Sequence, residues 1–62
     1  FLLALAAIHG SLADVQAKGG EFGEAVENYQ KAIELAEVGG DAELADLLRD
    51  RLNSHRRAKA AP

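Results

Sequence analysis

The sequence contains no cysteine, no methionine and no tryptophan, and its one proline is the last of its 62 residues. Without cysteine the chain has neither a disulfide nor a thiolate zinc site, which excludes disulfide-rich miniproteins and most small zinc modules. A chain of this length forms one small domain at most, and such domains usually need a staple or a partner chain to be stable. Nearly half of the residues are hydrophobic, so we do not expect a disordered chain.

Strand signals are also missing from the sequence. No window alternates apolar and polar residues with a period of two, and β-branched residues are few. The pairs Gly19-Gly20 and Gly39-Gly40 each end a stretch of helix-forming residues, where glycine can take the left-handed conformation that closes a helix. The sequence therefore predicts an all-α fold with helices over residues 2–18, 22–37 and 41–57, and with residues 58–62 fraying.

The first helical segment carries one apolar stripe at helical spacing: Leu5, Ile8, Leu12 and Val15. Gly10, in the middle, either marks the close approach of another helix or splits the segment, so that Ser11 caps a new helix. We expect one continuous helix. The apolar run over residues 1–8 is too short to span a bilayer, which takes about 20 residues, and we interpret it as buried helix.

The other two segments have clearer boundaries. The second is amphipathic, and its apolar stripe comprises Phe22, Ala25, Val26, Tyr29, Ala32, Ile33 and Ala36. The third opens with Asp41, a residue type favoured as an N-cap. Its apolar stripe comprises Leu44, Leu47, Leu48, Leu52 and His55.

The net charge of −3 hides an asymmetry. In residues 1–48, Lys18 and Lys31 stand against nine acidic residues, whereas residues 49–62 carry five cations against Asp50, a net charge of +4. An acidic body repels phosphates, so we expect no nucleic-acid partner. Because the one apolar run is too short to span a bilayer, we expect no membrane partner either. We interpret the basic end as the C-terminal part of the third helix, where cations interact favourably with the helix dipole. The alternative interpretation is that these cations contact an anionic partner.

Motifs for catalysis or metal binding are missing. His9 and His55 stand alone, Ser11 and Ser54 lack a neighbouring base, and the glycine pairs do not form a phosphate-binding loop. We interpret one set of carboxylates as a solvated helix face: Glu21, Glu24, Glu27 and Glu34. We therefore expect no cofactor, no metal site and no enzymatic activity. With no complete signal peptide, the compartment stays open.

Two stretches of the chain carry a family resemblance. The turn reads Gly20-Glu21-Phe22-Gly23-Glu24-Ala25, and the following helix reads Tyr29-Gln30-Lys31-Ala32-Ile33-Glu34-Leu35. Together they resemble the tetratricopeptide repeat, a helix–turn–helix unit of about 34 residues. The first helix departs from that family's pattern at three positions, because His9 replaces an aromatic residue, Ala13 a glycine and Gln16 a tyrosine.

The resemblance covers residues 6–39 and implies one antiparallel helical hairpin. Residues 41–57 then resemble the closing helix of a bacterial repeat array, which gives a right-handed α-solenoid fragment of three helices. Ala13, Ala25 and Ala32 would let two helices approach closely, with Leu12 filling the gap. The alternative is a generic helical hairpin. Because the chain starts at Phe1 rather than at methionine, we expect a fragment or a processed product.

The resemblance implies a non-catalytic protein-interaction or scaffold module, whose partner is a protein, a peptide or further repeats of the parent chain. The groove of such repeats would here expose four residues: Gly10, Asp14, Ala17 and Lys18.

Two other hypotheses stay open. About three repeats are usually needed for stability, so the chain could instead be a structural cap or a homo-oligomer. That contact would use Leu3, Leu5 and Ile8, or Leu44 and Leu48. The other hypothesis is a C-terminal fragment of a larger enzyme whose catalytic domain lies elsewhere.

Overall fold

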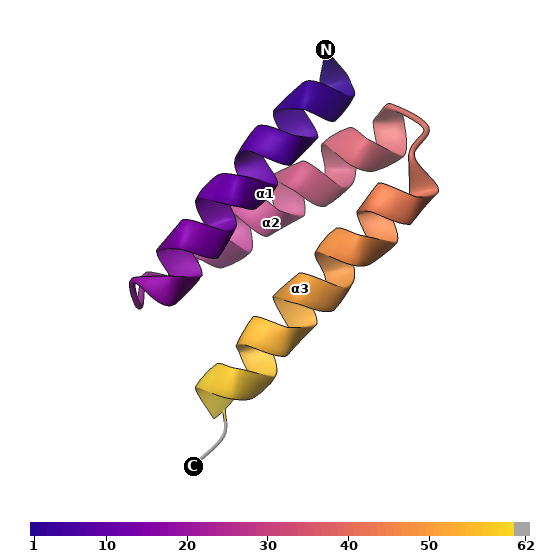
Figure 1. The fold of residues 1–62 in the computed structure, drawn as a ribbon. Coiled ribbons are helices and arrows are strands. Elements are labelled where there is room, and N and C mark those ends of the chain that lie inside the picture. The colour runs from indigo at the N-terminus through magenta and orange to yellow at the C-terminus, as the bar shows by residue number, and fades with distance from the viewer. Residues whose placement is uncertain (61–62) are drawn as a thin grey trace.

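Three helices make up the structure, a computed structural model that describes residues 1–60. They are α1 (Leu2–Lys18), α2 (Phe22–Val38) and α3 (Ala42–Ala60). Figure 1 shows α1 and α3 on the same side of α2, which runs in the opposite direction and packs against both. Residues 1–60 contain no strand, so the prediction of an all-α fold is confirmed.

Both turns between helices close in the same way. Gly20 and Gly40 have φ angles of +84° and +81°, in the left-handed region that favours glycine. At the first turn, the backbone N–H of Glu21 donates to the carbonyl of Gln16 at 2.8 Å, which satisfies a carbonyl that the helix end leaves free. The role predicted for the two glycine pairs is therefore confirmed.

The ends of α3 depart partly from the prediction. The carboxylate of Asp41 accepts a hydrogen bond from the backbone N–H of Leu44 at 3.0 Å, so the predicted N-cap is confirmed. The predicted fraying of residues 58–60 is corrected, because the helix continues to Ala60. Ala58 is a strong helix former, and Arg57 and Lys59 in the last turn favour the helix dipole. Residues 61–62 lie outside the described residues.

Alanine makes up most of the interior. The buried alanines are Ala6, Ala13 and Ala17 of α1, Ala25, Ala32 and Ala36 of α2, and Ala45 of α3. Tyr29, Leu48 and Leu52 are the large side chains among the buried residues. Short side chains let helix axes approach closely, as expected for Ala13, Ala25 and Ala32. The stripe predicted for α2 faces this interior.

Gly10 of α1 lies under Leu48 of α3. A Cβ atom on Gly10 would stand only 2.8 Å from Cδ2 of Leu48, so a larger residue would push Leu48 away. The backbone of α1 is continuous through Gly10. Of the two sequence-based alternatives, the close approach of another helix is therefore confirmed, and the split segment is wrong.

The large apolar side chains of α1 face outward. Leu12 is 45% exposed, Ile8 61% and Val15 67%, whereas Ala6 is buried. The prediction that residues 1–8 form a buried helix is therefore wrong, although the run is helical from Leu2. Leu12 likewise does not fill the gap between helices. The reason is that α1 turns its smallest residues towards α2, which leaves its larger stripe on the opposite side.

Candidate interaction surfaces

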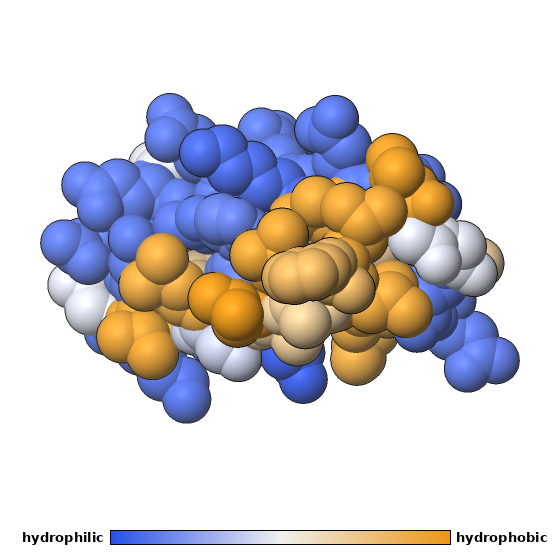
Figure 2. Space-filling model, turned by 90° about the horizontal axis from the view of Figure 1, so that it is seen from above, coloured by the Kyte–Doolittle hydropathy of each residue, from blue (hydrophilic) through white to orange (hydrophobic). Residues whose placement is uncertain are grey.

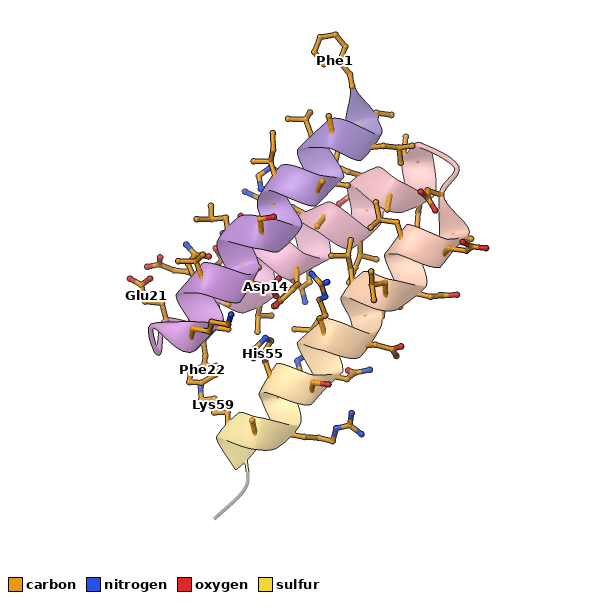
Figure 3. All side chains as sticks on the ribbon, viewed as in Figure 1. Phe1, Asp14, Glu21, Phe22, His55 and Lys59 are labelled. Atoms are coloured by element: carbon orange, nitrogen blue, oxygen red, sulfur yellow. The ribbon has the colours of Figure 1, made fainter. Side chains whose placement is uncertain are left out.

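Asp14 links all three helices. The Tyr29 hydroxyl of α2 donates a hydrogen bond to Oδ1 of Asp14, and the Arg51 guanidinium of α3 donates to Oδ2 at 2.9 Å. The imidazole of His55 stacks on the Tyr29 ring, with centroids 5.7 Å apart and planes at 25°. In Figure 3, Asp14 and His55 lie in the space between α1 and α3. One carboxylate thus holds side chains from both neighbouring helices.

The surroundings of Tyr29 keep its hydroxyl protonated. Burial raises the pKa of Tyr29 above its ordinary value of about 10, because the phenolate would lose its hydration. The Asp14 carboxylate raises it further, since it accepts the hydroxyl proton as a hydrogen bond and its charge opposes a second anion. Tyr29 is therefore a hydrogen-bond donor at neutral pH, and this cluster fixes the position of the helices.

A second polar network joins α1 to α2. The imidazole of His9 donates to Oδ1 of Asn28 at 3.0 Å, and the Asn28 amide donates to Oε1 of Gln16 at 2.6 Å. The Gln16 amide in turn donates to Glu24 at 3.3 Å. His9 and Gln16 thus hold α1 to α2 through hydrogen bonds to Asn28. The sequence alone does not identify Asn28. This residue lies on α2, and helical spacing does not show which residues of α1 lie beside it.

The outward side of α1 forms an apolar surface, here called the α1 apolar face. It comprises four exposed side chains at helical spacing: Leu5, Ile8, Leu12 and Val15. Figure 2, which looks down on the end that carries the N-terminus, shows apolar side chains gathered in one region among hydrophilic residues. Phe1 projects beyond that end in Figure 3. A contiguous apolar patch of this kind typically marks an interaction site.

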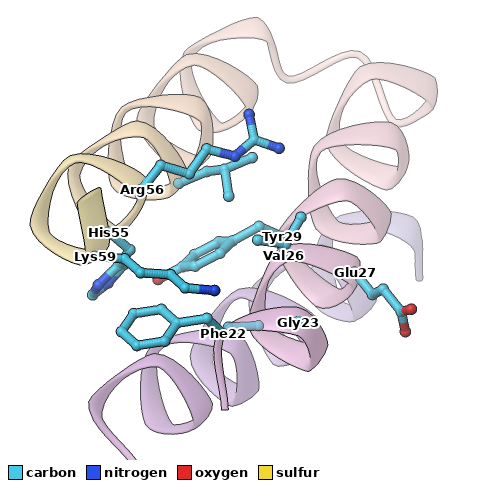
Figure 4. A pocket seen from close by; sticks show the side chains of 10 residues that line it. Phe22, Gly23, Val26, Glu27, Tyr29, His55, Arg56 and Lys59 are labelled. Atoms are coloured by element: carbon cyan, nitrogen blue, oxygen red, sulfur yellow. The ribbon is translucent and has the colours of Figure 1, made fainter. Parts of the chain in front are cut away.

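A groove lies between the start of α2 and the end of α3. It has a volume of about 620 Å³, and Figure 4 shows the side chains that line it. Its apolar lining comes from Phe22, Val26, Tyr29 and Leu52, and its polar lining from Glu27, His55, Arg56 and Lys59. We call it the α2/α3 groove. The Lys59 amino group lies 5.2 Å from the centroid of the Phe22 ring, a cation–π distance.

The groove residues implied by the family resemblance do not all reach the surface. Gly10 and Ala17 are buried, so neither is available to a partner, which corrects that expectation. Asp14 is half-buried and already holds Tyr29 and Arg51. Lys18 is exposed at the end of α1. Leu48 covers Gly10, which is the physical reason that this part of α1 is closed.

The residues predicted for self-association divide into two groups. Leu3, Leu5 and Ile8 are exposed together on α1, and Leu3 also packs against Gly39 at the end of α2. Leu44 is half-buried and Leu48 is buried. The expectation that Leu48 takes part in a contact between copies is therefore corrected, because this side chain packs inside its own chain.

Within residues 1–60, no group of three or more histidine, aspartate or glutamate side chains is placed to hold a metal ion. No helix in the same range is both long enough and apolar enough to cross a membrane. Comparisons of the chain with models of protein families, with curated proteins and with solved structures give no match.

Proposed function

We propose that this chain is a non-catalytic protein-interaction module, in which α3 closes a tetratricopeptide-like hairpin of α1 and α2. The α1 apolar face carries the proposal. α1 buries alanine and glycine and presents Leu5, Ile8, Leu12 and Val15 to the outside. Burial of a leucine, isoleucine or valine side chain contributes about 1.5–3 kcal/mol. A partner that covers the exposed parts of these side chains, which are 40–67% exposed, therefore gains apolar burial that the chain itself does not provide.

The local geometry of the hairpin supports its relation to tetratricopeptide repeats. The turn that resembles the family closes α1 at Gly20, and Ala25 and Ala32 of α2 lie buried in the interior. Tyr29, part of the resembling second helix, is also fully buried. These are the positions at which the sequence matches the family, and each has a packing role.

The experiment is to compare the binding partners of the protein in cells that make it with those of a variant carrying Ile8→Asp and Val15→Asp. We expect the variant to lose at least one protein or peptide partner, because a carboxylate on the face must be desolvated on binding. Val38→Asp is the control, since Val38 is 70% exposed and lies on α2. An unchanged set of partners in the double variant contradicts the proposal.

Self-association is a second candidate function, favoured by the small size of the interior. Tyr29, Leu48 and Leu52 are its large members, while leucine, isoleucine and valine side chains remain exposed on α1. In this version a second copy covers Leu3, Leu5 and Ile8, and the chain is a homo-oligomer. Sedimentation at several concentrations decides it: association that Ile8→Asp abolishes supports self-association, and a monomer throughout contradicts it.

A further inference from the structure

The α2/α3 groove has a distribution of charge that points to a specific kind of ligand. Its α3 wall carries Arg56 and Lys59, and its α2 wall carries Glu27. In Figure 4, the Lys59 side chain runs above Phe22, the Tyr29 ring lies between α2 and α3, and Glu27 points away from both rings. The groove therefore combines an apolar floor with a cationic wall along one side.

The two cations of this wall differ from Arg49 and Arg51, which also lie on α3. Arg49 pairs with Glu37 and Asp46, and Arg51 pairs with Asp14. Among residues 1–60, neither Arg56 nor Lys59 has a carboxylate partner within ion-pair distance. The cations that hold α3 in place are thus separate from those that face the groove, so the charges at the groove are free to bind an anion.

The negative charge of the remaining surface restricts an anionic ligand of the groove to a short molecule. Residues 1–48 carry a net charge of −7, which repels a long polyanion such as a nucleic acid and an anionic lipid surface alike. A volume of about 620 Å³ is within the range of small-ligand sites and is enough for a few side chains. A short peptide segment with both apolar side chains and a carboxylate fits this volume and avoids the repulsion.

We propose that the α2/α3 groove binds a short acidic peptide segment. Its apolar side chains would lie on Phe22, Val26 and Leu52, and its carboxylates would pair with Arg56 and Lys59. This site is separate from the α1 apolar face, so it stands or fails independently of the function proposed above. It places a second partner, of different chemistry, at the opposite end of the molecule from Phe1.

Fluorescence anisotropy with two labelled hexapeptides tests the proposal on the intact chain. One probe alternates leucine and glutamate, and the other alternates leucine and glutamine. We expect the acidic probe to bind with a Kd on the order of 100 μM, as a small open contact gives. Binding of the neutral probe should be several-fold weaker. Equal binding of the two probes, or no binding of the acidic one, overturns the proposal.

Neighbouring arginines provide the matched control. Arg56→Gln should weaken binding of the acidic probe about three- to fivefold, the range of one exposed ion pair. Arg57→Gln makes the same change of charge one residue away, outside the groove lining, and should have less effect. Equal loss in both variants overturns the proposal, because it shows attraction to the basic helix end in general. Sedimentation of the chain without peptide supplies the last test. If the chain self-associates and Arg56→Gln abolishes that association, the groove binds a second copy of the chain, which also overturns the proposal.

Discussion

The hydroxyl of Tyr29 on α2 donates a hydrogen bond to the carboxylate of Asp14 on α1, at a point where both helices otherwise meet through alanine. A buried phenol needs a partner for its hydroxyl, and Asp14 provides one in a single register of the two helices. Alanine contacts alone specify that register weakly, because neighbouring turns of α1 offer similar small residues. Together with the hydrogen bonds of Asn28 to His9 and Gln16, this hydrogen bond fixes how α1 and α2 are aligned. Arg51 extends the link from Asp14 to α3.

Alkaline pH should destabilise the fold through Tyr29. The pKa of Tyr29 is raised in the folded chain, so the folded chain keeps a proton that the unfolded chain releases near pH 10. The contribution of Tyr29 to the free energy of unfolding is complete below about pH 10 and is lost as the pH rises above it. Urea unfolding at about pH 8 and about pH 11 measures this loss. Tyr29→Phe has no phenolic proton, and an equal pH dependence in that variant contradicts the prediction.

Removing the Asp14 carboxylate should weaken the contacts among all three helices. Asp14→Ala leaves the buried Tyr29 hydroxyl without an acceptor, and we expect a loss of about 1–3 kcal/mol in the free energy of unfolding. Asp14→Asn keeps an acceptor oxygen and should cost less. The matched control is Asp50→Ala, an exposed aspartate on α3, which should change little. Chemical unfolding followed by circular dichroism measures all three, and equal effects at positions 14 and 50 contradict the role given to Asp14.

Two glycines near the first turn should respond in opposite directions to the same substitution. Gly20 has a φ of +84°, so Gly20→Ala forces alanine into the left-handed region at a cost of about 1–2 kcal/mol. Gly23 lies in the first turn of α2, and a Cβ there meets no atom within 4 Å. Gly23→Ala should raise stability by up to about 1 kcal/mol, because alanine favours the helix. Thermal unfolding of the two variants side by side checks the signs, and the same sign in both is the contrary result.

The sequence predicted the bounds of α1 and α2 to within one residue, but it predicted the buried face correctly only for α2, for a reason that lies in their side chains. In α2, large and small apolar residues share one face, so the helical period identifies the buried side around Tyr29. In α1, two stripes have helical spacing, one of leucine, isoleucine and valine and one of alanine and Gly10. Hydrophobicity favours the first stripe, but the close approach of α2 selects the second. Periodicity alone does not decide between them.

The candidate sites were harder to predict because they join residues far apart in the sequence. Asp14 meets Arg51, and Phe22 meets Lys59, in each case across 37 positions. No local spacing signals either pair. The basic end of α3 was visible in the sequence, but residues 58–62 were expected to fray, which hid the contact of Lys59 with Phe22. The fold class thus follows from local patterns, whereas the sites depend on where α3 packs.

The contact between Gly10 and Leu48 should control the docking of α3. Gly10→Val places a branched side chain where Leu48 now lies, and we expect a loss of about 1–3 kcal/mol, as overpacking gives. Gly10→Ala should be nearly neutral, because the end of Leu48 can turn away and alanine favours the helix by about 1 kcal/mol. Hydrogen exchange should show faster exchange in α3 of the valine variant than in α1 and α2, because α3 detaches first. Uniform loss of protection across all three helices, or a valine variant as stable as the parent chain, contradicts this account.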